Sequence, residues 1–322
     1  MASADAPDQL ALFAPPDPMG PVYRAAAELR ARLPEALRFG TSSWGFPGWQ
    51  GVVYAASRSE SALARDGLAE YARHPLLRTV GIDRGYYAPI PPRDLQRYDA
   101  QLPPGFRACL KAPASVTSAV VPGDPSAAPR TNPDFLHPDR YLRDMGHVLA
   151  EHFLPRTALL MFELPPVPPA FRLDPDDFAA RLDDFLGALP PGVSYAVELR
   201  DPRLFGPPYG RVLRRRGVSH VYNYWTAMPA LAAQSRRFAI ADQPVGVVRL
   251  LLAPGTRYAD RKRAFAPFAE LRAVDPTMRA DVVALVRQCL GAGREGYVLV
   301  NNKAEGSSPR TIWALAEMLA ET

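Results

Sequence analysis

The feature that most constrains the fold of this chain is a regular alternation of short β-like runs and helical patterns. Eight runs with strand character follow one another after residue 37. Strands that alternate with helices form parallel βα units, and eight such units predict a TIM-type (β/α)8 barrel of the α/β class. An open doubly wound sheet is the alternative, although no GxGxxG or phosphate-loop motif supports a nucleotide-binding fold. The eight runs are 38–44, 79–83, 106–111, 158–163, 193–198, 219–224, 246–252 and 296–301.

Helical patterns occupy most of the connections between these runs. Two of them begin with Asp followed by Pro, at Asp174 and Asp275, which is a typical N-cap and first-turn sequence. The connection between the fifth and sixth runs is expected to hold one short helical turn at most. The predicted helices are 61–73, 93–101, 138–152, 175–189, 227–236, 276–290 and 310–319.

The length of 322 residues suits one large barrel domain. We assign residues 1–36 to a flexible Pro/Ala-rich tail with a short helix at 22–33, and residues 37–322 to the barrel. Cys109 and Cys289 provide no disulfide framework. No apolar run approaches the roughly 18 residues of a membrane span. No basic residue precedes Arg24, so we expect a cytoplasmic protein with no signal peptide and no membrane contact.

The choice of basic residue is more informative than the net charge of +5. Only three of the 38 basic residues are lysines, namely Lys111, Lys262 and Lys303. In a chain so rich in arginine, we expect a Lys where a compact, titratable amine is needed. The basic residues form no dense block, so direct binding of nucleic acid is not favoured.

Polar residues gather where the predicted strands end. The carboxyl ends of all strands of a parallel barrel meet at one mouth, where active sites are built. Because side chains alternate along a strand, Glu198 and Arg200 share a face, as do Cys109 and Lys111. We therefore expect the polar strand ends to converge in one pocket. The candidate residues are Lys111, Glu163, Glu198, Arg200, Arg249, Asn301, Asn302, Lys303, Trp44, Asp83 and Tyr87.

The candidates combine acid–base groups with anion-binding groups. Glu198 is the candidate general acid or base, and Glu163 either assists it or holds a divalent cation. Lys111 is a candidate base, Schiff-base amine or point charge. The other candidates form the predicted ligand-binding set. A structural interpretation competes with this one, in which the charged residues form an ion network that closes the rim and the aromatic residues pack there.

The histidines do not suggest a metal centre, and no cofactor is indicated. Four of them fall in predicted helices or loops and are expected at the surface, whereas His220 begins a strand and is expected to be structural. A metal-dependent nuclease is therefore a weaker hypothesis. The four surface candidates are His74, His137, His147 and His152.

The polar strand ends also carry a resemblance to a known family. Residues 39–49, FGTSSWGFPGW, resemble the family opening GTSGWxYxGW, and residues 300–309, VNNKAEGSSP, resemble its closing NNKAEGSSP. Residues 196–201, 111–113 and 164–166 resemble its VExR, FKxP and FQLPP segments. Together these segments are similar to the YecE-like family, domain of unknown function 72, over roughly residues 38–321. The resemblance implies a TIM-type barrel and no established reaction.

The chain departs from the family pattern in three places. The family's VEINSTFY reads VGIDRGYY at residues 80–87, so that its Glu is replaced by Gly81. The family's YxRLHG reads VVRLLL at residues 247–252, so that its His is replaced by Leu251. The TH after FKxP reads Thr117-Ser118. A mechanism that uses the family's Glu or His cannot operate here, which shifts the expected chemistry to Lys111 and the charged residues around it.

The tail contains a second distinctive segment. Residues 9–13, QLALF, resemble the bacterial sliding-clamp binding peptide QL(S/D)LF. Gln9 would supply hydrogen bonds, while Leu10, Leu12 and Phe13 would anchor in an apolar groove. A polar, Pro-rich tail is a suitable setting for such a peptide. The alternative is that these apolar side chains pack on the barrel surface.

Two classes of function follow from these features. The first is an enzyme that acts on a small anionic substrate, carrying phosphate or carboxylate, at the barrel mouth. The alternative is a non-catalytic binding module linked to DNA replication or repair through its tail peptide.

The tail interpretation makes a first prediction. A peptide covering residues 7–15 is expected to bind the bacterial sliding clamp with a Kd in the micromolar range, roughly −7 to −8 kcal/mol, because an extended peptide loses backbone freedom on docking. The double variant Leu12→Ala/Phe13→Ala should lose this binding in a titration. In the full chain, the same changes should leave the melting temperature unchanged. Packing of the tail on the barrel predicts the reverse of both results.

Overall fold

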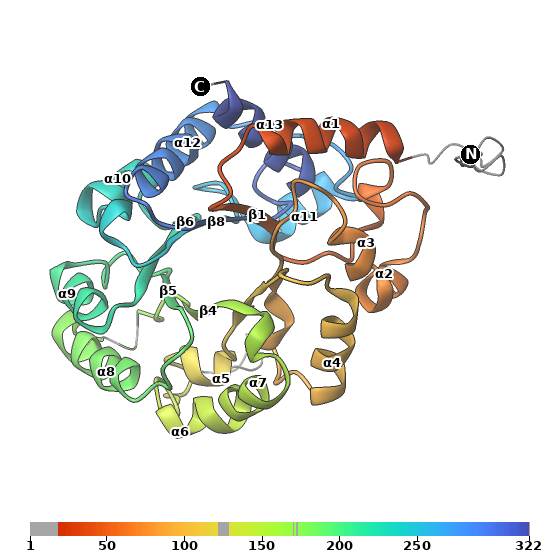
Figure 1. Cartoon of the computed structure of the whole chain (residues 1–322). Helices are drawn as coiled ribbons and strands as arrows, with labels where there is room; N and C mark the ends of the chain where they lie inside the picture. The colour runs from red at the N-terminus through yellow and green to blue at the C-terminus, as the bar shows by residue number, and fades with distance from the viewer. Residues whose placement is uncertain (1–18, 122–128, 170, 172, 322) are drawn as a thin grey trace, which may run out of the picture.

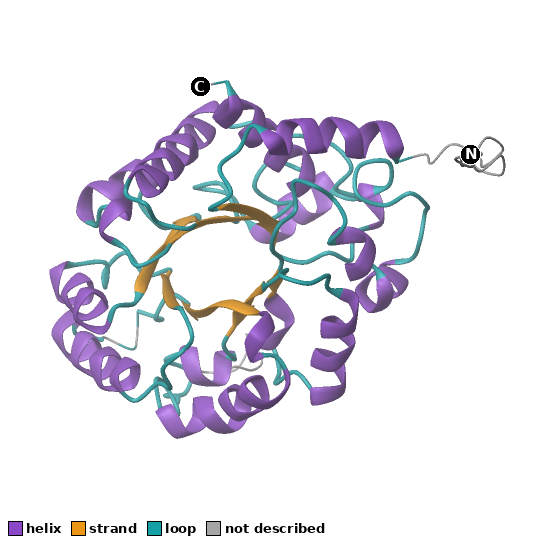
Figure 2. Ribbon diagram, viewed as in Figure 1, coloured by secondary structure: helices purple, strands orange, loops and turns teal. Residues whose placement is uncertain are grey.

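The computed structural model describes residues 19–121, 129–169, 171 and 173–321. The predicted peptide residues Gln9, Leu10, Leu12 and Phe13 therefore lie outside the described residues. Eight parallel strands form one sheet in the order β1-β8-β7-β6-β5-β4-β3-β2, surrounded by helices (Figures 1 and 2). The strands are β1 (Leu37–Thr41), β2 (Gly81–Ile82), β3 (Ala108–Lys111), β4 (Thr157–Leu164), β5 (Tyr195–Leu199), β6 (Ser219–Tyr224), β7 (Gly246–Leu250) and β8 (Gly296–Val300). The predicted TIM-type barrel is confirmed.

The outer ring consists mainly of α-helices, and the helix before β1 packs beside the last helix of the chain (Figure 1). Arg32, at the end of α1, donates a 2.7 Å hydrogen bond to the carbonyl of Ala320 in α13. The α-helices are α1 (Gly20–Ala31), α2 (Glu60–Asp66), α3 (Leu68–Tyr71), α4 (Pro92–Gln101), α5 (Ala114–Thr117), α6 (Pro138–Tyr141), α7 (His147–His152), α8 (Pro175–Gly187), α9 (Pro207–Arg216), α10 (Leu231–Arg237), α11 (Tyr258–Phe265), α12 (Pro276–Gly291) and α13 (Ser308–Ala320).

Several helix boundaries follow from the residues at their ends. Asp174 accepts hydrogen bonds from the backbone amides of Asp176 and Asp177, and Asp275 accepts one from Met278, so both predicted N-caps are present. The predicted helix 61–73 is split at Gly67 into α2 and α3. Among the described residues, no helix has the length and apolarity needed to cross a bilayer.

Two expectations from the sequence were wrong. The connection between β5 and β6 holds the ten-residue helix α9 rather than a single turn. Its sequence begins with Pro207 and Pro208, which suit a first turn, and Gly217 ends it with a left-handed φ of 62°. His74 is buried rather than at the surface, and burial lowers its pKa to about 4.

The barrel closes through a short contact between β1 and the segment before β2. Phe39 and Leu77 form a single parallel bridge, and the carbonyl of Phe39 accepts hydrogen bonds from the amides of Arg78 and Thr79 at 2.8 and 3.2 Å. A Cβ atom built on Gly40 would lie 2.3 Å from the carbonyl oxygen of Thr79. The two segments therefore approach more closely than any side chain at position 40 permits.

The barrel interior is divided into an apolar and a polar part. Side chains on one face of the strands form a small buried cluster inside the barrel, which includes Cys109, Met161, Val247 and Tyr297. The other face packs against the helices in the main core. Because side chains alternate, the inward face continues from Cys109 to Lys111 toward the strand ends. The polar residues of the mouth therefore rest on an apolar floor.

The close approach at Gly40 gives a second prediction. Gly40→Ala is expected to lower the free energy of unfolding by about 1–3 kcal/mol, because the added methyl group forces the two segments apart. Gly296→Ala on the neighbouring strand β8 is the matched control, since its Cβ would meet nothing closer than 3.7 Å. Denaturant titrations of both variants measure the difference. Equal losses of stability would contradict the proposed role of the close contact.

Candidate functional site

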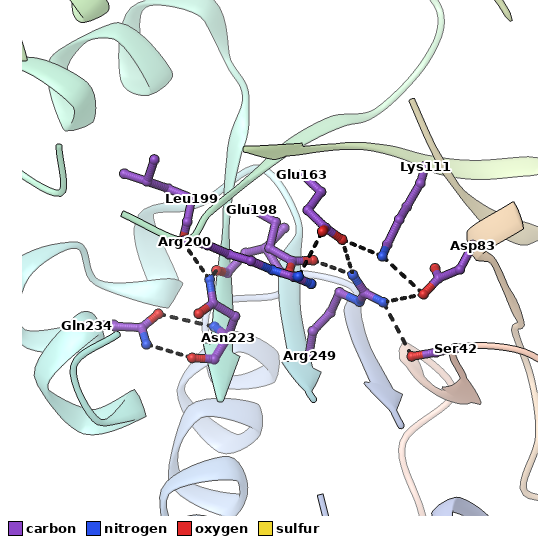
Figure 3. A network of polar contacts seen from close by, with 11 residues as sticks. Ser42, Asp83, Lys111, Glu163, Glu198, Leu199, Arg200, Asn223, Gln234 and Arg249 are labelled. Carbon is purple, nitrogen blue, oxygen red and sulfur yellow. Dashed lines mark hydrogen bonds and ion pairs between the residues drawn. The ribbon is translucent and has the colours of Figure 1, made fainter. Parts of the chain in front are cut away.

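Six charged side chains at the mouth form a closed ring in which positive and negative groups alternate (Figure 3). We call this set the charge ring. Each member pairs with the next, and the last pairs with the first. In order, the members are Asp83, Lys111, Glu163, Arg200, Glu198 and Arg249.

The contacts within the charge ring are short. The Nζ atom of Lys111 lies 3.1 Å from Asp83 Oδ2 and also contacts Glu163 Oε2. Arg200 places Nη1 2.7 Å from Glu163 Oε1 and Nη2 2.5 Å from Glu198 Oε1.

Arg249 completes the ring by contacting Glu198 Oε2 through Nη1, and Asp83 Oδ2 at 2.9 Å through Nη2. The same Nη2 atom donates to the Ser42 hydroxyl at 3.3 Å. Ser42 was not a candidate from the sequence, although it lies in the polar segment that follows β1.

The strand register explains why these residues meet. Glu163 and Glu198 are direct neighbours in the pairing of β4 with β5, and Lys111 ends β3 beside β4. Arg200 follows Glu198 by two residues and lies on the same face, as predicted. Two adjacent carboxylates would repel each other, and the guanidinium of Arg200 between them removes that repulsion.

Burial and pairing shift the pKa values of Glu198 and Arg249 in the charge ring. Burial by itself raises the pKa of Glu198, but Arg200, Arg249 and Lys111 outweigh this effect and lower that pKa to about 2. Burial lowers the pKa of Arg249, yet the carboxylates of Asp83 and Glu198 raise it well above its usual value. Glu198 and Arg249 are both 0% exposed, so neither contacts solvent. Glu198 therefore stays ionised at neutral pH and is poorly matched to general acid–base catalysis.

Several predicted ligand-binding residues make hydrogen bonds that hold the loops in place. The Oδ1 atom of Asn302 accepts hydrogen bonds from the Trp49 indole at 3.2 Å and from the amide of Ser308 at 2.8 Å. Asn301 accepts from the amide of Lys303 at 3.1 Å. Trp44 is buried and donates to the carbonyl of Leu63 at 3.1 Å, so it packs as the structural interpretation expected.

Lys303 differs from the other cations of the mouth. Its Nζ atom lies 4.4 Å from the centre of the Tyr258 ring, and it forms no ion pair within the described part of the chain. Burial lowers its pKa to about 8, and Lys262 and Lys111 act in the same direction against Asp83. Tyr258 was missed by sequence reasoning because α11, on which it lies, has no clear apolar periodicity.

Other aromatic residues surround the charge ring. Lys111 Nζ lies 5.5 Å from the centre of the Tyr86 ring, and the guanidinium of Arg200 lies 4.2 Å from the centre of the Trp225 ring. Tyr87, a predicted ligand contact, is 83% exposed and packs edge-on against Tyr86. The mouth therefore combines charged groups with aromatic faces.

The departures from the family pattern have a structural counterpart at β2. A Cβ atom on Gly81 would lie 3.0 Å from the backbone of Thr41 and Ser42, so a Glu side chain does not fit there without a shift. Asp83, two residues later, supplies the carboxylate that enters the charge ring. Leu251, at the family's His position, is buried.

The charge ring is not arranged as a metal site. Each of its carboxylates contacts at least two cationic side chains, which would repel a divalent cation. In residues 19–321, leaving out the undescribed positions, no group of three or more His, Cys, Asp or Glu side chains is placed to hold a metal ion.

These features define a parallel (β/α)8 barrel protein with a buried charged centre at the carboxyl ends of its strands. The chain belongs to the family described as "Protein of unknown function DUF72", which matches residues 38–322. A DUF72 family protein from Enterococcus faecalis has 17% sequence identity and a TM-score of 0.58, over 88% of this chain and 95% of that chain.

A second DUF72 family protein, from Thermotoga maritima, has 19% identity and a TM-score of 0.56, over 88% of this chain and 98% of that chain. At this identity the two structures support the fold alone. No curated protein is significantly similar to this chain.

The charge ring gives a third prediction. Glu198→Gln leaves three buried cations against two carboxylates, so the variant should be about 3–5 kcal/mol less stable than wild type at pH 7. The pKa of Glu198 is lower in the folded chain than in the unfolded chain, so its contribution is complete above about pH 4.5 and is lost as the pH falls toward about 2. The stability gap should shrink over the same pH interval.

Glu270→Gln is the control for that experiment, because Glu270 forms a single exposed ion pair with Arg272. This change should cost at most about 1 kcal/mol. Urea titrations of the three proteins at a series of pH values give the comparison. A gap between Glu198→Gln and wild type that stays constant down to pH 2 would show that the charge of Glu198 does not stabilise the fold.

Proposed function

We propose that the protein is an enzyme that acts on a small anionic substrate at the barrel mouth, with Lys303 as the cation that attracts the substrate. The observation that carries this proposal is the difference between Lys303 and the charge ring. Lys111, Arg200 and Arg249 each form ion pairs with at least two carboxylates, whereas Lys303 forms none among the described residues and lies over the Tyr258 ring. The ring is neutral as a whole, so Lys303 supplies the excess positive charge beside it.

In this proposal, the charge ring forms the rigid, charged base of the substrate site. Its buried groups are held by two opposite charges each and need no rearrangement when a substrate binds, which is the condition for electrostatic preorganisation. Asp83 is the most exposed member, at 21% of its side chain, and its Oδ1 atom has no hydrogen-bond partner among the described residues. We therefore infer that Asp83 is the ring member that faces a bound substrate.

Lys303 suits both binding and proton transfer. A pKa of about 8 leaves the amine mostly protonated at pH 7, yet close enough to neutrality to release its proton. We infer that Lys303 is the acid–base group, with Asp83 beside it, and that Glu163 and Glu198 position the cations. This assignment replaces the role first considered for Glu198.

A non-catalytic binding module is the second candidate. The sequence of residues 9–13 favours it, because that segment resembles a sliding-clamp binding peptide. In this case, the barrel would be brought to DNA replication or repair by its tail.

The fourth prediction tests the enzyme proposal through Lys303. The protein is incubated with a metabolite extract, washed, and its retained small molecules are identified by mass spectrometry. Wild type is expected to retain an anionic compound, and Lys303→Met should retain at least about tenfold less, since one charge-assisted contact contributes about 1.5–3 kcal/mol. Arg215→Gln is the control, because Arg215 is an exposed residue that pairs with Asp183 on the outer surface.

The same compound provides a pH test. Its affinity should fall as the pH rises from 7 to 9, because Lys303 loses its positive charge around pH 8. Lys303→Arg should bind with no inflection near pH 8, since Arg stays charged. Retention of the compound by Lys303→Met at the wild-type level would refute the role of Lys303. Turnover of the retained compound by wild type, absent in Lys303→Arg, would distinguish an enzyme from a binding module.

A further inference from the structure

A second charged region lies beside the mouth and shares Asp83 with the proposed active site. It is a groove with a volume of about 480 Å³ between α2, α4 and the segment after β2. This volume is in the range of small-molecule binding sites. Three arginines line it, Arg65, Arg84 and Arg97, together with the hydroxyl-bearing Ser43 and Ser61.

The arginines of the groove have fewer acidic partners than the cations of the charge ring. Arg84 and Arg97 share a single carboxylate, that of Asp94, at 2.9 and 3.0 Å. Arg65 pairs with Asp66 at 2.8 Å. Asp83 is the acidic residue in the groove lining, and its charge is already balanced by Lys111 and Arg249. The groove therefore carries a net positive charge.

Asp94 holds the two guanidinium groups in place while leaving them accessible. The side chain of Asp94 is only 11% exposed, whereas those of Arg84 and Arg97 are 48% and 39% exposed. Arg84 also donates to the Tyr98 hydroxyl at 2.9 Å, whereas the Nε atom of Arg97 is buried and has no acceptor among the described residues. Two fixed, partly exposed guanidinium groups are suited to an oxyanion.

The donors that line the groove favour a phosphate group over a carboxylate. A phosphate group offers three terminal oxygens, enough for two guanidinium groups and for hydroxyl donors such as Ser43 and Ser61. A carboxylate offers only two. Trp44 and Tyr98 form one wall and contact each other edge-on with ring centres 5.1 Å apart, which gives an apolar surface for the rest of a ligand.

We propose that this groove binds the phosphate group of a small phosphorylated molecule through Arg84 and Arg97. The site is separate from Lys303, so it stands whether or not the mouth is catalytic. Asp83 belongs to both the groove and the charge ring, so a ligand held by its phosphate would extend toward the mouth.

The test, our fifth prediction, is calorimetric titration of the full chain with inorganic phosphate and with glycerol 3-phosphate at low ionic strength. Arg84→Gln/Arg97→Gln should raise Kd for both probes at least about tenfold, because two charged donors are lost. Arg97→Lys keeps the charge opposite Asp94 but loses the planar fork, and should weaken binding several-fold. If the double variant fails to fold, Arg97→Lys still tests whether Arg97 binds the phosphate.

Arg263→Gln is the matched control, because Arg263 forms the same type of i,i+3 pair with Asp260 on an exposed helix. Its Kd should stay within about twofold of wild type, as should that of Lys303→Met. Phosphate binding that is lost in Lys303→Met but kept in the double variant would place the phosphate at the mouth and overturn the proposal. Equal affinity for acetate, or binding of a DNA oligonucleotide without binding of either phosphate probe, would overturn it as well.

Discussion

The structure of the mouth depends on the mutual neutralisation of six buried charges. Removing an ion from water costs several kcal/mol even after the protein relaxes, and one buried pair rarely recovers that cost. In the charge ring, each group has an opposite charge on both sides, so that no member is left with a single partner. A closed alternating ring is the arrangement in which six charges satisfy this condition with the fewest contacts. Loss of any one member leaves its two neighbours partly unpaired.

The strands of the barrel provide the geometry that the ring requires. Neighbouring positions on β4 and β5 place Glu163 and Glu198 side by side. The guanidinium of Arg200 lies between the two carboxylates and offsets their repulsion. On the opposite side, the close approach at Gly40 and Gly81 brings the segment after β2 near β1. There Arg249 contacts both Asp83 and Ser42. The ring thus ties strands from both sides of the barrel together at one level, above an apolar floor.

The sequence alone predicted the barrel and the meeting of its charged strand ends. The alternation of side chains along a strand was sufficient to predict that Lys111, Glu198 and Arg200 point into the barrel mouth. This rule depends only on backbone geometry. The rule does not say which charges pair, so an anion pocket was expected where a neutral ring is found. The role of Asn302 could not be predicted either. A side-chain amide that follows a strand can form hydrogen bonds with its own loop, as Asn302 does with the amide of Ser308, as readily as with a ligand.

Helices with weak signals were also harder to predict. In α9 the two prolines and Gly210 obscure the periodicity, although prolines are well tolerated in a first turn. The missed helix α11 carries Tyr258, and without that helix the surroundings of Lys303 were not foreseeable. His74 follows α3 in a segment that reads as a surface turn, yet its ring packs against Tyr23 of α1. Contacts of this kind join residues far apart in the sequence, so no local sequence pattern predicts them.

The neutrality of the charge ring also limits what the ring can do by itself. A ring with three positive and three negative groups has little net attraction for an anion at a distance, because its fields largely cancel. In our proposals, the attraction of an anion comes from charges outside the ring, namely Lys303 and the arginines of the groove. The carboxylate of Asp83 belongs to the charge ring and also lines the groove, so the two charged regions meet at this residue.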